Sequence, residues 1–148
     1  SENNINNAKE NLTYHKIPLP NLYVTNGDNL GVEQENYYDF IFSSIAMQHI
    51  CVHKIRYSIL TCMYKALKKG GRISIQMAFG TFRKNSVGYF ENCFNAMGTN
   101  GGYDTRVEDP NEIKKDLDSI GFKGFEYWVR PGGPGNADAN WIFFTASK

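Results

Sequence analysis

The sequence predicts one α/β domain, built as a three-layer sandwich around a mixed sheet. Two observations carry this prediction: helical and strand-like segments alternate through the first two-thirds of the chain, and two strand-like segments joined by a turn close it. Alternation is typical of parallel strands joined by crossover helices, whereas the closing pair must run antiparallel or nearly so. The chain has 148 residues, 41% of them hydrophobic, so residues 1–148 can bury one core as a single domain.

Apolar spacing and end signals predict the helices. In the most regular one, apolar residues recur at positions i, i+4, i+7, i+8, i+11 and i+12, and Gly70-Gly71 follows as a stop signal. Asp109 is a good N-cap for a second helix, which Gly121 ends, and Ser1 is an N-cap for a third. The predicted helices span residues 1–14, 54–67 and 110–120.

Short apolar runs between polar turns predict the strands. These runs span residues 22–24, 38–42, 72–77, 125–130 and 141–146. The first run ends in the turn Asn26-Gly27-Asp28-Asn29, and the second leads into Ser43-Ser44. Residues 78–108 have no clean period, and we expect an irregular insertion or a substrate lid there, because long irregular segments in compact domains are usually functional.

Composition excludes several classes of function. Sixteen Lys and Arg residues against fifteen Asp and Glu residues leave a formal charge of +1, so bulk electrostatics favours neither nucleic acid nor a membrane as a partner. No apolar run approaches the roughly 20 residues needed to cross a bilayer, and the polar first residues lack a signal-peptide core. The three cysteines have no metal-ligand spacing, which predicts reduced thiols, a cytoplasmic location and no metal site.

Five motifs follow one another along the chain in an informative order. They are GDNL at 27–30, YDFIFSSIAMQHI at 38–50, LKKGGRI at 67–73, Gly121-Phe122, and WIFFT at 141–145. In this order they resemble the acidic turn after strand three, the fourth-strand motif, the turn before strand five, the last helix end and the antiparallel strand seven of class I S-adenosylmethionine-dependent methyltransferases. The resemblance covers nearly the whole chain and implies a Rossmann-like mixed sheet with an antiparallel C-terminal strand.

Two parts of the family pattern are absent from the sequence: the glycine-rich G-x-G-x-G loop after the first strand, and the acidic residue that ends strand two. Ser1-Glu2-Asn3-Asn4 looks like the sequence that directly follows that acid. We therefore expect the C-terminal part of a methyltransferase domain, N-terminally incomplete. The missing strands are central in the family's sheet, so we expect the 148-residue chain alone to be unstable, to aggregate or to pair with another copy.

The resemblance implies two groups of residues that bind the cofactor S-adenosylmethionine. The Asp28 carboxylate would accept a hydrogen bond from the adenine amine, and the backbone N–H of Asn29 or Leu30 would face a ring nitrogen. Ser43 and Ser44 would let the backbone approach the methionine part of the cofactor. The alternatives, from the residues alone, are a turn stabilised by the Asp28 side chain and a plain strand-to-helix turn with a serine cap.

His49 is the candidate for acid–base catalysis, because an imidazole titrates near neutral pH. The alternative is a partly buried histidine that fixes the loop after the fourth-strand motif by a hydrogen bond. His15 and His53 have no identifiable partners in the sequence and are expected at the surface.

Aromatic residues of the irregular segment are candidates for a substrate pocket. Arg83 or Arg106 would pair there with an acidic substrate. The alternative is a small core under a long loop. The candidate substrate residues are Phe82, Tyr89 and Tyr103.

Together, these features predict an enzyme that transfers a methyl group from S-adenosylmethionine to a small-molecule acceptor. The alternative is a non-catalytic scaffold or partner-binding subunit derived from a methyltransferase, because no other segment replaces the glycine-rich loop. A nicotinamide-dependent dehydrogenase is a weaker third hypothesis, since it needs the same loop and the closing antiparallel pair fits it poorly. The expected partners are the small-molecule substrate and a second copy of the chain.

Overall fold

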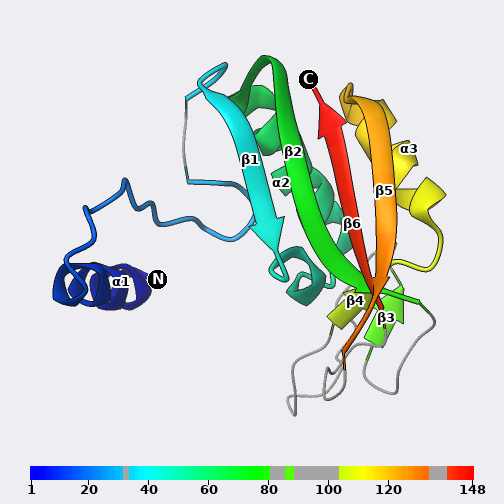
Figure 1. Ribbon diagram of the computed structural model, residues 1–148. Helices are drawn as coiled ribbons and strands as arrows, with labels where there is room; N and C mark the ends of the chain where they lie inside the picture. Colours follow the sequence, from blue (N-terminus) through cyan, green and yellow to red (C-terminus); the bar gives the residue numbers. More distant parts are fainter. Residues whose placement is uncertain (32–33, 81–85, 89–103, 134–139) are drawn as a thin grey trace.

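A four-stranded sheet with helices packed against one face forms the centre of the computed structural model (Figure 1). The structure describes residues 1–31, 34–80, 86–88, 104–133 and 140–148. Its strands are β1 (Tyr38–Ser44), β2 (Leu67–Phe79), β5 (Lys123–Pro131) and β6 (Asn140–Ser147), and a separate sheet pairs β3 (Ser86–Gly88) with β4 (Asp104–Arg106). Its helices are α1 (Glu2–Tyr14), the short 3-10 helix η1 (Met47–His49), α2 (His53–Ala66) and α3 (Pro110–Ile120).

The central sheet is mixed, with the strand order β1-β2-β6-β5. Strands β1 and β2 run parallel, and α2 is the crossover helix between them. Strand β6 runs antiparallel to both of its neighbours, β2 and β5. The predicted α/β class and the Rossmann-like mixed sheet with an antiparallel C-terminal strand are therefore confirmed.

One face of the sheet encloses the hydrophobic core together with α2 and α3. Side chains alternate in direction along a strand, so every second residue of β2 and β6 faces the helices. On β2 these residues are Ile73, Ile75 and Met77, each at most 1% exposed. The core residues from α2, α3 and β6 are Ile59, Leu60, Met63, Ile113, Leu117, Ile142, Phe144 and Ala146.

The opposite face of the sheet is covered by no helix of the described residues. In Figure 1, α2 and α3 lie behind the sheet, whereas α1 stands to one side of it and buries none of its residues. Phe40 and Phe42 of β1 are therefore 55% and 71% exposed. Across the same face, the exposed Trp128 of β5 stacks against Phe143 of β6, with 5.0 Å between ring centroids. Among the described strands, β1 pairs only with β2, which leaves its other edge free in this part of the chain.

The strand predicted at residues 22–24 does not form, and this part of the sequence interpretation is wrong. The segment lies instead beside α1, where the Leu22 and Val24 side chains line a shallow hollow together with Ile5 and Lys9. A strand is stable only when a neighbour takes up its backbone hydrogen bonds. No strand of the described residues pairs with this segment.

The predicted helix-end signals are confirmed at α3, and α2 ends within one residue of its predicted end. The Asp109 carboxylate accepts a hydrogen bond from the first turn of α3, and Gly121 ends this helix in the left-handed conformation, with a φ of 118°. Helix α2 ends at Ala66, one residue before its predicted end, but β2 begins at Leu67 and not at the predicted residue 72, so the glycine pair lies inside the strand. Leu67 follows at once, fully buried and opposite Tyr38 of β1, so strand pairing begins before the glycines are reached.

His53 belongs to an ion pair, contrary to the expectation of a surface histidine without a partner. Its Nε2 lies 2.9 Å from Oδ2 of Asp116, and the two side chains are 19% and 7% exposed. The hydroxyl groups of Tyr57 and Ser119 make a second contact between the same two helices, at 2.9 Å. Both pairs join α2 to α3 and so hold the crossover helix in place against the sheet.

The exposed aromatic residues of β1 and its free edge predict self-association of the 148-residue chain. We expect sedimentation velocity to show dimers or larger species as concentration rises, and to show fewer of them for Phe42→Lys, which places a charge on this surface. Tyr14→Lys is the matched control, because Tyr14 is 82% exposed but lies on α1. A wild-type chain that stays monomeric and melts sharply at every concentration would contradict this prediction.

Breaking the pair between α2 and α3 should destabilise the fold. We expect His53→Ala and Asp116→Ala each to lower the free energy of unfolding by about 1–3 kcal/mol, because each leaves a mostly buried partner without its hydrogen bond. The double variant should lose less than the sum of the two. The control is the Lys114–Asp118 pair on the surface of α3, for which we expect a coupling of about 0.5 kcal/mol or less. Equal coupling energies for both pairs, measured by urea unfolding, would argue against a special role of His53.

Candidate functional site

The carboxyl ends of β1 and β2 define the candidate site. Because the two strands are parallel, their carboxyl ends lie at the same end of the sheet. Ligands of open α/β sheets bind at that end. Strand β1 leads through Ser43 and Ser44 towards η1, and β2 ends at Phe79. The helix η1 also contacts β2 and β4, so these segments meet at one end of the sheet.

The bend that follows β1 is strained, and a cross-strand hydrogen bond holds it. The Ser44 hydroxyl donates to Oε1 of Gln76 at 2.7 Å, and the two residues lie opposite each other in the β1–β2 register. Ile45 has a φ of 62°, in the left-handed region that a β-branched residue rarely adopts. Such strain persists only where the surroundings impose it, and it is common at functional sites. Sequence reasoning missed Gln76, whose one signal is a polar residue inside an apolar strand.

Two buried arginines anchor the segments that leave the sheet at this edge. Arg56 of α2 is fully buried, and its guanidinium donates a hydrogen bond to the Ile50 carbonyl. Arg106 of β4 is 2% exposed, and its Nη1 donates to the Phe79 carbonyl at 3.3 Å. Arg106 therefore holds the end of β2, a role that sequence reasoning did not foresee.

Gln48 and His49 of η1 are adjacent in the sequence but differ in exposure. Gln48 is 2% exposed, and its Oε1 has no hydrogen-bond partner among the described residues. The His49 side chain is exposed. The acid–base role of His49 and its alternative, a hydrogen bond that fixes the loop, both stay predictions.

The turn at residues 26–30 leaves the Asp28 side chain exposed. Oδ1 of Asn26 accepts a hydrogen bond from the backbone N–H of Asp28 at 3.4 Å, and Oδ1 of Asn29 accepts one from the N–H of Gly31 at 2.8 Å. Within the described residues, the Asp28 carboxylate makes no hydrogen bond of its own. The side chains of Asn26 and Asn29 therefore hold the turn, as asparagine turn chemistry predicts, and the binding role of Asp28 stays a prediction.

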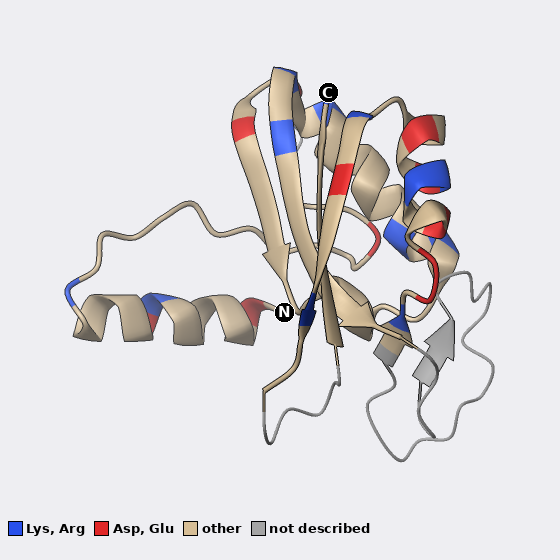
Figure 2. Cartoon of the chain, turned by 45° about the vertical axis from the view of Figure 1, so that its right-hand side comes forward, with Lys and Arg blue, Asp and Glu red and all other residues tan. Residues whose placement is uncertain are grey.

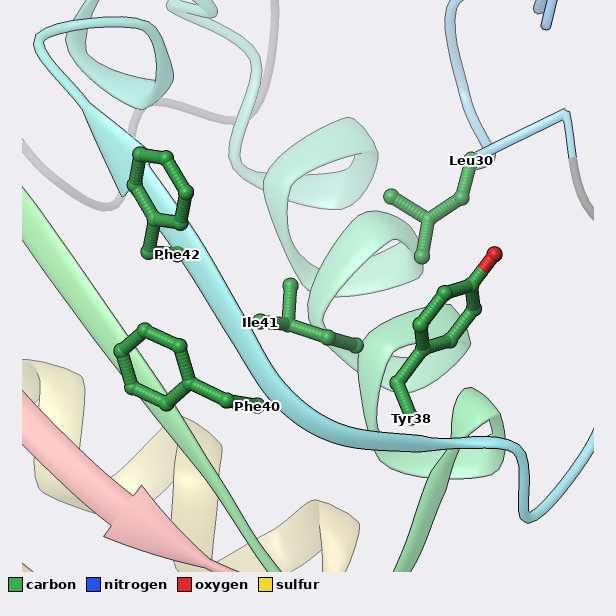
Figure 3. Close-up of a pocket in the computed structure, with 5 residues that line it drawn as sticks. All are labelled: Leu30, Tyr38, Phe40, Ile41 and Phe42. Carbon is green, nitrogen blue, oxygen red and sulfur yellow. The ribbon is translucent and has the colours of Figure 1, made fainter. Parts of the chain in front are cut away.

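A hollow of about 290 Å³ lies against β1, and we call it the β1 hollow (Figure 3). It is lined by Leu30, Tyr38, Phe40, Ile41 and Phe42. Figure 3 shows that Leu30 lies near Tyr38 and Ile41 on one side of the strand, with Phe40 and Phe42 on the other. The residues that line it are apolar or aromatic, so the hollow suits a planar, weakly polar ligand.

The predicted cofactor-binding residues differ in their relation to the β1 hollow, because Leu30 lines it whereas Asp28, Asn29, Ser43 and Ser44 do not. Leu30 lines it, and Asp28 precedes Leu30 by two residues; Ser43 follows directly after Phe42, which lines the other side. Burial raises the pKa of the Tyr38 hydroxyl, and the neighbouring phenol of Tyr23 raises it further, so the chain before the turn also lies close to β1. The binding roles of these segments, Asn29 and Ser44 included, stay predictions.

Charges of both signs are spread over the described residues (Figure 2). Near the start of β1, the exposed Lys68 and Asp39 form an ion pair at 2.9 Å, and Arg72 lies 3.8 Å from Glu126 further across the sheet. This arrangement offers no concentrated surface for a polyanion on the part of the chain that the structure describes. Within the same ranges, no helix is both long and apolar enough to cross a membrane.

The segment predicted as an irregular insertion is described only in part. Strands β3 and β4 pair in parallel there, and Phe79 forms a bridge to Val107. The predicted substrate residues lie outside the described residues, and their roles stay predictions; they are Phe82, Tyr89 and Tyr103.

Relieving the strain at Ile45 should stabilise the fold. We expect Ile45→Asn to raise the free energy of unfolding by about 1 kcal/mol, because Asn enters the left-handed region at lower cost than a β-branched residue. Ile45→Ala is the matched control, since it removes the same side chain but does not favour the left-handed region as Asn does. Urea unfolding compares the two variants, and an Ile45→Asn protein no more stable than the Ile45→Ala protein would contradict the backbone strain at this position.

No family model matches this sequence, and no curated protein matches it. Solved structures match its fold. One is a SAM-dependent methyltransferase from Aquifex aeolicus, with a TM-score of 0.58 and 14% identity over 95% of this chain and 61% of that chain. Another, from Methanosarcina mazei, has a TM-score of 0.56 and 15% identity over 83% of this chain and 65% of that chain. A third is phosphoethanolamine N-methyltransferase 2 from Haemonchus contortus, with a TM-score of 0.51 and 19% identity over 78% of this chain and 34% of that chain.

The chain thus spans from 34% to 65% of the length of these three structures. The identities are low, so the likeness lies in the arrangement of strands and helices. The chain has the Rossmann-like fold of class I S-adenosylmethionine-dependent methyltransferases.

Proposed function

We propose that this chain carries part of the active site of an S-adenosylmethionine-dependent methyltransferase that acts on a small molecule. The observation that supports it most is the strained bend at Ser44 and Ile45, which lies at the carboxyl edge of the sheet next to the β1 hollow. The Haemonchus contortus enzyme was solved with phosphomonomethylethanolamine, and a Burkholderia thailandensis methyltransferase of similar fold with 1,6-didemethyltoxoflavin. These two ligands favour a small acceptor for this chain as well.

The described residues fit the nucleoside part of the cofactor. Leu30, Ile41 and Phe42 line the part of the β1 hollow closer to the carboxyl end of the strand, and we assign the purine ring to this apolar surface. Asp28, two residues before Leu30, has an exposed carboxylate that can accept a hydrogen bond from an exocyclic amine. An apolar slot with a single well-placed acceptor is the usual composition of a small-molecule site.

The cofactor, when bound, would supply a methyl group on a sulfonium centre: in-line attack of the acceptor's nucleophile on the methyl carbon breaks the carbon–sulfur bond and releases the neutral thioether S-adenosylhomocysteine. The protein's part is to hold both reactants at attack distance and to exclude water. We assign the methionine part of the cofactor to Ser43 and Ser44, whose small side chains allow the backbone to come close. To His49, exposed on the segment that follows, we assign removal of the proton that the acceptor's nitrogen or oxygen loses.

Binding of S-adenosylhomocysteine to the whole protein tests the proposal. We expect calorimetry to show saturable binding, and Asp28→Asn to weaken it about tenfold, because hydrogen bonds to a charged acceptor are stronger than those to a neutral one. Asp39→Asn is the matched control, since Asp39 is exposed but paired with Lys68. Equal affinities for the two variants would refute the role of Asp28.

Absence of binding at millimolar cofactor would refute the proposed activity itself. The alternative, a non-catalytic scaffold or partner-binding subunit, would then be favoured, because the fold would persist without its ligand. The exposed aromatic face of the sheet, which includes Phe42 and Trp128, supplies an apolar surface for that alternative.

A further inference from the structure

We propose that Gln76 is a positioning residue, which holds the Ser44 hydroxyl as a hydrogen-bond acceptor for the ammonium group of the cofactor's methionine part. This inference rests on the proposed function, because it concerns the same ligand. It adds a residue of β2 to a site otherwise built from the turn before β1 and the bend after it.

The first part of the argument is the geometry of the hydrogen-bonded pair Ser44 and Gln76. Ser44 is the last residue of β1, and Gln76 lies directly opposite it on β2, so their side chains project on the same face of the sheet. The Ser44 hydroxyl donates to Oε1 of Gln76 at 2.7 Å, which is an ordinary length for a hydrogen bond between two oxygen atoms. Ser44 is exposed, whereas Gln76 is half-buried. Gln76 is therefore the more restrained of the two, and it orients Ser44.

The neighbours of Gln76 restrain it further. On its other side, Phe143 of β6 lies opposite Gln76 in the register. The Phe143 ring is itself stacked against Trp128, with an interplanar angle of 6°. This aromatic pair bounds Gln76 on the side away from β1, so hydrogen bonding of its carboxamide is directed towards Ser44.

The second part of the argument is the hydrogen-bonding chemistry of the Ser44 hydroxyl group. A serine hydroxyl has one hydrogen to donate and two lone pairs that accept. With its hydrogen directed to Gln76, Ser44 can only accept a hydrogen bond from a ligand. Of the two charged groups at the amino-acid end of the cofactor, the ammonium group donates and the carboxylate accepts, so Ser44 is matched to the ammonium group.

The third part of the argument is the strained backbone at Ile45. Ile45 follows Ser44 with a φ of 62°, so the chain turns sharply away directly after the hydroxyl-bearing residue. A strained bend at the carboxyl end of a strand is a common way to present one residue to a ligand. The hydrogen bond to Gln76 then leaves the lone pairs of the Ser44 hydroxyl oxygen directed towards the ligand.

Two ligands that differ only at the amino-acid end test the inference by calorimetry on the whole protein. S-adenosylhomocysteine has the ammonium group, and 5′-methylthioadenosine shares its nucleoside and thioether but lacks it. We expect Gln76→Met to weaken S-adenosylhomocysteine about 5- to 10-fold, the effect of one hydrogen bond, and to leave 5′-methylthioadenosine unchanged. Unchanged binding of the second ligand also shows that the variant is folded.

Three further variants separate positioning from a general structural effect. Gln76→Glu keeps an acceptor for the Ser44 hydroxyl, so S-adenosylhomocysteine should bind within about threefold of wild type. Ser44→Ala combined with Gln76→Met should bind no more weakly than Ser44→Ala alone, because Gln76 acts through Ser44. Ser74→Ala, on the same face of β2 and opposite Phe42, is the matched control and should change neither affinity.

The outcomes distinguish this inference from the proposed function. If the wild type binds neither ligand, the proposed function fails and the inference fails with it. If the wild type binds both ligands and Gln76→Met weakens both equally or neither, the role of Gln76 is overturned while the proposed function stands.

Discussion

Parallel pairing of β1 with β2 is the constraint on which the rest of the structure depends. Parallel neighbours cannot be joined by a tight turn, so the chain crosses over through α2, on the face that becomes the core. The same pairing brings both carboxyl ends to one edge, where Ser44 meets Gln76. The crossover helix also supports that edge, because its buried Arg56 donates a hydrogen bond to the Ile50 carbonyl.

Helices on one face of the sheet make the two faces chemically different. Exposed apolar area costs roughly 25 cal/mol per Å², so the open face favours any contact that covers its aromatic side chains. On the β5–β6 half, the chain partly does this itself: Trp128 stacks on Phe143, and the Arg130 guanidinium lies 5.1 Å from the centre of the Phe143 ring. On β1, the rings of Phe40 and Phe42 stack on each other, with ring centroids 6.3 Å apart, and both stay mostly exposed within the described structure. The uncovered apolar surface therefore concentrates beside the free edge of the sheet.

Elements with local signals could be predicted from the sequence, and elements that depend on a distant neighbour could not. Helix α3 begins after Asp109 and ends at Gly121, as capping chemistry predicts, because both signals act within one turn. The segment at residues 22–24 has the composition of a strand but no strand beside it in the described structure. Leu67 has such a neighbour in Tyr38, and with this pairing β2 begins at Leu67 and not at the predicted residue 72.

The same distinction between local signals and distant neighbours applies to the candidate site. Ser43 and Ser44 could be named as candidates from the sequence, because they follow an apolar run within a motif that resembles a known family, and their binding role stays a prediction. The partner of Ser44 is 32 residues away, and the register of β1 against β2 selects it. No pattern within either strand specifies that register. Since a hydroxyl becomes a donor or an acceptor according to the partner it already has, the chemistry that the bend offers to a ligand is decided by Gln76 on β2, outside the motif that contains Ser44.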